Sequence, residues 1–129
     1  MPLLTQKNVG GLTVTPGIAT LSETITTAGS YLSPTLAVPG LPRIQFFARF
    51  YGGPGVPFPS SSGTVQFQVA TRTENGEPDF FLFRYVMMPP QIGATYEFNY
   101  PCIAIRVLLG APTTGTLCNV DYSLNAFGP

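Results

Sequence analysis

Apolar and polar residues alternate along much of this chain, so that one side chain in two is apolar. In residues 43–51 the apolar set falls on every second position: Ile44, Phe46, Ala48 and Phe50. Residues 64–72 repeat the pattern with Val65, Phe67 and Val69. Successive side chains of a strand point to opposite faces, so this alternation predicts strands with one buried face.

Similar runs predict further strands over residues 23–27, 31–38, 80–88, 95–100, 103–109 and 116–127. Residues 80–88 are apolar on both faces except for Arg84, so we expect this strand to lie centrally or beneath a partner. Pro34 places its segment at a sheet edge or in a bulge. Proline and glycine pairs separate the runs, and Asn75-Gly76 is a hairpin-turn signal. The sequence therefore predicts an all-β antiparallel β-sandwich or jelly roll of about seven to nine strands.

The N-terminal segment differs from the rest because glycines and prolines interrupt its threonine-rich runs. We expect residues 1–22 to form an extended arm, with a short strand at residues 12–15 or 18–21, and residues 23–129 to form the sandwich domain. No charged segment followed by an apolar stretch opens the chain, so we expect no signal peptide and assembly in a cytoplasm.

Charged residues are scarce, which changes the picture of the surface. They make up 9% of the chain, against about 25% in an ordinary soluble domain. The formal net charge is zero, and Lys7 is the single lysine. Neutrality removes the basic field that nucleic-acid or membrane binding needs, so we expect neither partner. A nearly uncharged surface is typical of a protein that other chains cover.

The inventory of catalytic side chains is equally thin. The chain has no histidine, which removes the commonest general acid–base and the usual nucleophile–histidine pairs. Glu74, Glu77 and Asp79 cluster in a polar segment that we interpret as a solvated turn, without the spacing of a calcium loop. Cys102 and Cys118 fit two buried small hydrophobes. We expect no enzyme, cofactor, metal site or small-molecule substrate.

The remaining cations point toward protein contacts. Five of the six basic residues are arginines, and arginine stacks on aromatic rings and forms bidentate contacts. One face of the strand over residues 43–51 combines arginine with aromatic residues, and the loop over residues 52–63 has an apolar tip. The candidate interface residues are Arg43, Phe47, Arg49, Tyr51, Val56, Phe58 and Arg84. Two alternatives stay open: arginines that pack over tyrosines on an exposed face, and a Phe58 that folds back onto its own core.

The closing segment Asp121-Tyr-Ser-Leu-Asn-Ala-Phe127, the Thr/Gly-rich arm and the aromatic strands resemble small β-sandwich virion proteins of tailed bacteriophages. Capsid decoration, or cement, proteins are the nearest kind. The resemblance implies a structural protein of the virion that binds the major capsid protein and copies of itself, commonly as a trimer. In that case the arm and the Arg/aromatic face stabilise the assembled shell by mass action.

A second hypothesis comes from a different class of protein. A receptor- or carbohydrate-binding module of a phage fibre or surface assembly would use the end loops, residues 52–63 and 73–79, as its binding site. The arm would then be a linker to a stalk. A glycan array distinguishes the two hypotheses.

Overall fold

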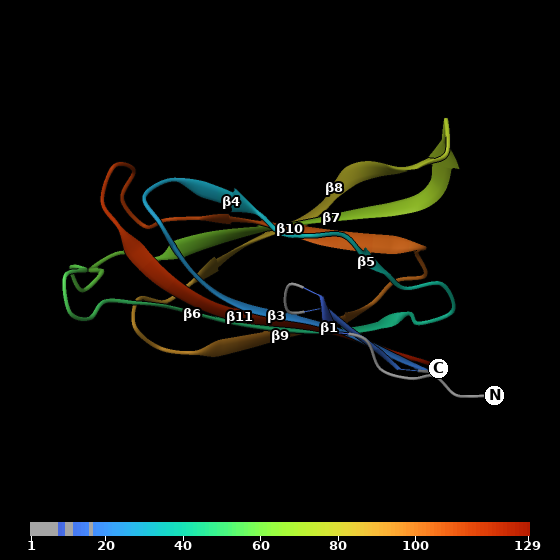
Figure 1. Ribbon diagram of the computed structural model, residues 1–129, viewed down its shortest axis with the longest axis horizontal. Coiled ribbons are helices and arrows are strands. Elements are labelled where there is room, and N and C mark those ends of the chain that lie inside the picture. Colours follow the sequence, from blue (N-terminus) through green and yellow to red (C-terminus); the bar gives the residue numbers. More distant parts are fainter. Residues whose placement is uncertain (1–7, 10–11, 16) are drawn as a thin grey trace.

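The computed structural model describes residues 8, 9, 12–15 and 17–129, and every regular element in that part of the chain is a β-strand (Figure 1). The strands are β1 (Asn8–Val9), β2 (Leu12–Thr15), β3 (Ile18–Thr27), β4 (Ser30–Leu32), β5 (Leu36–Ala37), β6 (Arg43–Tyr51), β7 (Gly63–Glu74), β8 (Glu77–Met88), β9 (Ala94–Asn99), β10 (Ala104–Gly110) and β11 (Cys118–Phe127). The all-β prediction is confirmed. The strands outnumber the expected seven to nine because short segments such as β1 and β5 pair separately.

The strands form two antiparallel sheets that pack face to face. Sheet A has the order β1-β2-β3-β11-β6-β9, and sheet B has the order β4-β10-β7-β8. The strand β5 also pairs with β10, so β4 and β5 act as one interrupted edge strand. Beyond the β1–β2 hairpin the pairing is nested: β3 with β11, β4 and β5 with β10, β6 with β9, and β7 with β8. This nesting gives the jelly-roll form of the predicted sandwich.

The core lies between the sheets and consists of the alternate residues that the sequence indicated. Phe46 and Phe50 of β6 and Phe67 of β7 are fully buried. The Phe46 and Phe67 rings meet edge to face with their centres 5.0 Å apart, which links sheet A to sheet B. The inward positions of β6 and β7 are therefore as predicted.

Two turn signals also correspond to the structure. Asn75 and Gly76 have φ angles of 55° and 83° and close the β7–β8 hairpin. Both residues tolerate positive φ, which suits a two-residue hairpin turn. Pro34 lies in the break between β4 and β5, at an edge of sheet B, as its missing N–H led us to expect.

The N-terminal segment is paired into sheet A where the structure describes it. β2 pairs with β3, and β3 pairs with β11 along all ten of its residues. The boundary that we expected between residues 22 and 23 therefore falls inside β3. Residues 1–7, 10, 11 and 16 of the expected arm lie outside the described residues.

The position of β8 corrects one expectation. We expected its doubly apolar sequence to lie centrally or beneath a partner, yet β8 is the last strand of sheet B. Within the described residues it pairs with β7 alone. The central position is wrong because β8 follows β7 through a tight hairpin and the chain then crosses to sheet A. The other explanation, that a separate protein chain covers β8, stays a prediction.

Candidate functional site

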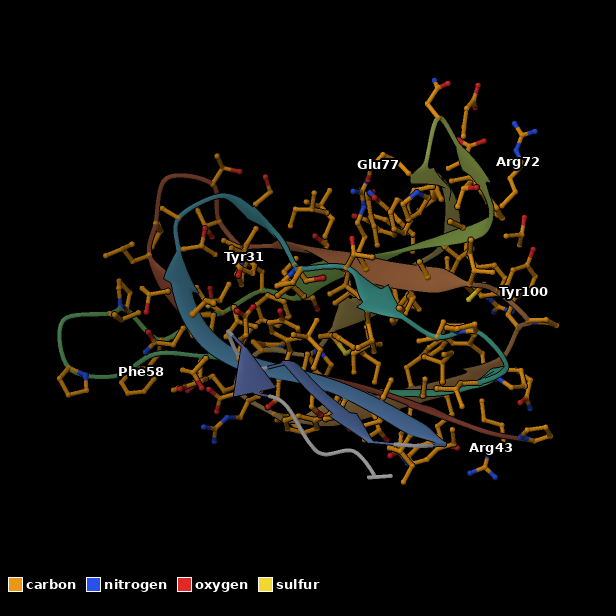
Figure 2. All side chains as sticks on the ribbon, turned by 45° about the vertical axis from the view of Figure 1, so that its right-hand side comes forward. Tyr31, Arg43, Phe58, Arg72, Glu77 and Tyr100 are labelled. Atoms are coloured by element: carbon orange, nitrogen blue, oxygen red, sulfur yellow. The ribbon has the colours of Figure 1, made fainter. Side chains whose placement is uncertain are left out.

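The candidate contact residues of β6 share the outer face of sheet A. Their neighbours in the strand point into the core, so the outward row consists of Arg43, Gln45, Phe47, Arg49 and Tyr51. Arg43 begins the strand and Tyr51 ends it, so the row spans the length of the sandwich. Figure 2 shows Arg43 and Phe58 at opposite ends of the molecule. The predicted residues therefore do not form one compact site.

Arg49 and Tyr51 belong to a polar network around Asp121 of β11. Arg49 donates a hydrogen bond to Asp121 at 3.2 Å, and Tyr51 and Thr24 donate to its other oxygen at 2.9 and 3.0 Å. The Arg49 guanidinium lies 4.1 Å from the centre of the Tyr51 ring. The hydrogen bond to Asp121, with burial second, raises the pKa of Tyr51, and Arg49 opposes the shift. Arg49 thus packs over a tyrosine, the first of the alternatives left open.

Sequence reasoning missed Asp121 as part of this network. Its outward position on the last strand follows from the alternation, but the register that places it opposite Arg49 joins strands 72 residues apart. No local pattern carries that register. The alternation in the sequence predicts the face of the sheet on which Asp121 lies. Its partner Arg49 becomes known only from the pairing of β6 with β11.

The other end of the outer face of sheet A contains a shallow hollow of about 510 Å³. Arg43 lines it with its guanidinium 5.3 Å from the centre of the Phe127 ring. Gln45 donates a hydrogen bond to Glu97 at 2.9 Å along the same rim. The hollow therefore combines the aromatic residues Phe98 and Phe127 with polar side chains, of which Arg43 is stacked and Gln45 and Glu97 are paired.

The loop between β6 and β7 exposes an apolar tip. The Phe58 side chain is 67% exposed, so it does not fold back onto the core, and Val56 closes a short bridge with Gly53. Phe58 lines a hollow of about 180 Å³ together with Leu117 of the β10–β11 connection. Figure 2 places Phe58 at the end opposite Arg72 and Glu77 of the β7–β8 hairpin. The two end loops therefore do not meet in one binding site.

Arg84 lies apart from the other candidates, on β8. It donates a hydrogen bond to the hydroxyl of Tyr96 of β9 at 2.8 Å, and its guanidinium lies 5.1 Å from the centre of the Phe83 ring. These contacts place it across the open rim between the two sheets. Its role there is to cover aromatic residues, because an arginine stem and head pack well on rings.

The outer face of sheet B is the surface that the candidate list missed. Its residues follow from the pairing with β7, whose Val65, Phe67 and Val69 are buried. The residues opposite the outward positions of β7 are Phe80, Leu82, Tyr85 and Met87. Leu82, Tyr85 and Met87 are 57%, 54% and 64% exposed, and Leu32 of β4, on the same face, is 45% exposed. One outer face of the sandwich therefore carries a row of exposed apolar side chains along β8, beside Thr64, Gln66 and Gln68 of β7, and the described residues do not cover that row.

Arg106, a cation on this face, bonds to its neighbours on the same face. Arg106 of β10 donates a hydrogen bond to the side chain of Gln68 at 2.7 Å, and its guanidinium lies 4.0 Å from the centre of the Phe80 ring. The arginine therefore packs over Phe80 while its charged group bonds to Gln68. The sequence signal for this face was the doubly apolar run of residues 80–88.

The described residues offer little reactive chemistry. Cys102 and Cys118 are free and buried. Burial raises the pKa of Cys102 to about 11 and raises that of Cys118, so both stay protonated at neutral pH. Across the described ranges, no three His, Cys, Asp or Glu side chains group closely enough to hold a metal ion. In that same part of the chain no helix is long and apolar enough to cross a membrane.

Comparisons with known proteins identify similar solved structures of low sequence identity. No protein-family model and no curated protein matches the chain. It is similar to the crystal structure of PirA, with 12% identity, a TM-score of 0.42 and coverage of 82% of this chain and 92% of the other. It is also similar to the Yersinia pseudotuberculosis-derived mitogen, with 14% identity, a TM-score of 0.38 and coverage of 87% and 86%. A structure of Bacillus endospore appendages, described as disulfide-linked pili, shares 8% identity with a TM-score of 0.43 and coverage of 99% and 100%.

Proposed function

We propose that this protein is a structural subunit that binds an assembled array of other protein chains, in the manner of a capsid decoration protein. The observation that carries the proposal is the contrast between the two outer faces. The outer face of sheet A is mostly hydroxyl, amide and charged side chains that bond to one another, as Thr26 does to Asn119 at 2.7 Å, and two of its aromatic residues, Tyr51 and Phe127, lie under arginines. The face of sheet B carries exposed Leu32, Leu82, Tyr85 and Met87.

An apolar face of this kind favours a protein partner. Exposed apolar side chains gathered on one surface mark contact sites, since their burial removes apolar area from water. Aromatic residues and methionine are enriched at such contacts, and lysine is depleted. The described part of sheet B follows this composition, with Tyr85 and Met87 exposed and Arg106 as a cation of the face. The low charge of the whole sequence agrees with this proposal.

The jelly roll itself is compatible with both hypotheses, because it occurs in viral capsid domains and in lectins. A fold alone therefore does not choose between them. The glycan-binding alternative needs a site at the end loops, and these loops lie at opposite ends of the sandwich (Figure 2). The hollow beside Arg43, with its aromatic residues and polar rim, is the surface that best supports that second candidate.

Gradient sedimentation of material from the native source tests the proposal. A decoration-type subunit sediments with particles far larger than its own 13.8 kDa, and free chain is a minor fraction. A glycan array with the purified protein is the parallel experiment. Exclusive recovery as small free protein, together with a defined glycan ligand, would replace the structural role by the binding-module role.

A further inference from the structure

The edge strand β8 contains a bulge, and its outward side chains lie symmetrically about that bulge. Phe67 is opposite Arg84 and Gln68 is opposite Leu82, so Phe83 is the extra residue. Two outward residues precede the bulge and two follow it, in the order Phe80, Leu82, Tyr85 and Met87. Leu82 and Tyr85 are equally far from the 83–84 peptide bond, and so are Phe80 and Met87. An isologous contact between two copies requires this kind of symmetry.

We infer that β8 pairs antiparallel with β8 of a second copy of this chain, with the bulges of the two copies side by side. A bulge ordinarily protects an edge, because it shifts the phase of side chains and hydrogen bonds relative to a straight strand. When two identical bulged strands pair antiparallel with their bulges side by side, both strands carry the same shift in phase. Their side chains and hydrogen-bonding groups therefore stay in register with each other. The inference rests on the proposed function, because part of the same apolar surface makes the contact.

The backbone supports this register. Tyr85 is opposite Gln66 and Leu82 is opposite Gln68, and these two glutamines lie two positions apart on β7. Residues two apart on a strand direct their N–H and C=O groups to the same side, so Tyr85 and Leu82 also share one side of β8. In the dimer Leu82 is opposite Tyr85 of the second copy, and both side chains stay on the outer face. Phe80 is likewise opposite Met87 of the second copy. Sheet B then continues from one sandwich into the next.

The size of the contact predicts a weak but specific dimer. Leu82, Tyr85 and Met87 are each more than half exposed, and Phe81 is 44% exposed on the inner side of the strand. With full side-chain areas of roughly 200 Å² the four offer about 400 Å² per copy, and the strand edges add to this. Because Leu82, Tyr85 and Met87 stay on the outer face, only the part of their area that faces the second strand is covered, and the total stays below about 1,200 Å², the lower end of specific interfaces. Dissociation in the micromolar range is the corresponding expectation.

Arg84 of each copy lies next to the symmetry axis of the dimer. This position provides a specific test of the register. Arg84 of each copy is opposite Phe83 of the other, so the two arginines approach each other. An Arg84→Glu variant mixed with unaltered protein should form mixed dimers beyond the statistical share, because opposite charges then meet at the axis. Native mass spectrometry of the mixture gives the ratio. A purely statistical mixture of dimers would overturn the register.

Cysteine cross-linking tests the same register without changing a charge. A mixture of Leu82→Cys and Tyr85→Cys proteins should form a disulfide between copies under mild oxidation, because the two positions are opposite each other. Leu82→Cys alone should not, because position 82 does not meet itself. The buried Cys102 and Cys118 of the unaltered protein serve as the background. Cross-linking of Leu82→Cys with itself, in place of the mixed pair, would contradict the inference.

Sedimentation equilibrium of the full chain measures the association itself. The expected species is twice the 13.8 kDa chain, in contrast to the trimer that the bacteriophage resemblance implies. Leu82→Lys should weaken dimerisation roughly tenfold or more, because lysine on an edge opposes pairing. Leu32→Lys is the matched control, because Leu32 lies on the same face but at the opposite edge of sheet B. A monomer at every concentration would overturn the inference.

The outcomes separate this inference from the proposed function. Protein that sediments with large particles but is monomeric after purification refutes the β8 dimer and leaves the structural role. A dimer with the mixed cross-link that never sediments with particles supports the β8 contact and refutes the decoration role.

Discussion

The hydroxyl group of Tyr31 on β4 donates a 2.8 Å hydrogen bond to the carboxylate of Glu23 on β3, which joins sheet B to sheet A. Tyr122 of β11 donates to the same oxygen of Glu23. Nearby, Ser33 accepts a hydrogen bond from the backbone N–H of Val107 at 2.9 Å. One side of the sandwich is therefore held by polar contacts, whereas the opposite rim is held by the packing of Phe83 against Phe98 and by the hydrogen bond of Arg84 to Tyr96.

The first prediction concerns the strength of this contact. Tyr31→Phe removes one donor from Glu23 and should lower the free energy of unfolding by about 1.5–3 kcal/mol, the range for a hydrogen bond to a charged group. Urea denaturation measures the change. Tyr100→Phe is the control, because within the described residues its hydroxyl makes no side-chain hydrogen bond, and it should change the stability by less than about 0.5 kcal/mol.

The second prediction concerns alkaline pH. Burial first, and then the hydrogen bond and charge of Glu23, raise the pKa of Tyr31 from 10.0 to about 12. Unfolded protein therefore loses this proton at a lower pH than folded protein does, so the contribution to stability is complete below pH 10 and is lost as the pH rises toward 12. Urea unfolding between pH 8 and 11.5 should show stability falling above about pH 10.

Tyr122 shifts in the same direction, since burial and Glu23 raise its pKa as well. The Tyr31→Phe variant should therefore show a shallower fall at alkaline pH and retain part of it. An identical pH profile for the variant and the unaltered protein would show that Tyr31 does not contribute to the alkaline loss.

The third prediction concerns the packing of the core against the start of β7. A Cβ atom at Gly63 would lie 2.5 Å from the ring of the fully buried Phe50. Gly63→Ala should destabilise the fold by about 1–3 kcal/mol, because the ring has to move within a filled core. Gly29→Ala is the control, since no atom lies within 4 Å of its Cβ position. Equal stability of the two variants would contradict this packing.

The fourth prediction concerns Asp121. Its ion pair with Arg49 is partly solvent-exposed, so Asp121→Asn should cost less than about 1 kcal/mol of stability. The same change should lower the pKa of Tyr51, because the hydrogen bond to Asp121 is the main cause of its raised value. Ultraviolet or NMR titration of Tyr51 measures the shift. An unchanged pKa of Tyr51 in the variant would show that a group other than Asp121 raises it.

The sequence was sufficient for the fold class because the alternation of β6 and β7 is local and strong. Ile44 through Phe50 and Val65 through Val69 alternate without interruption, so the inward faces could be predicted residue by residue. The nested strand pairing involves partners far apart in the chain, such as Thr24 and Asp121, and no local signal carries it.

The candidate site was only partly predictable for the same reason. The outward row of Arg43, Gln45, Phe47, Arg49 and Tyr51 followed from periodicity. The bulge at Phe83 changes the phase of β8, so alternation alone assigns Tyr85 and Met87 to the wrong face. Only the pairing with β7 shows that Leu82 and Tyr85 share the outer face.

Site-specific photo-cross-linking in the native source tests the central claim most directly. A cross-linking residue at Tyr85, on the outer face of sheet B, is compared with one at Ser123, on the polar face of sheet A. The proposed structural role predicts cross-links from position 85 to other protein chains, including a second copy, and few from position 123. Cross-links confined to position 123, or none from either position, would contradict it.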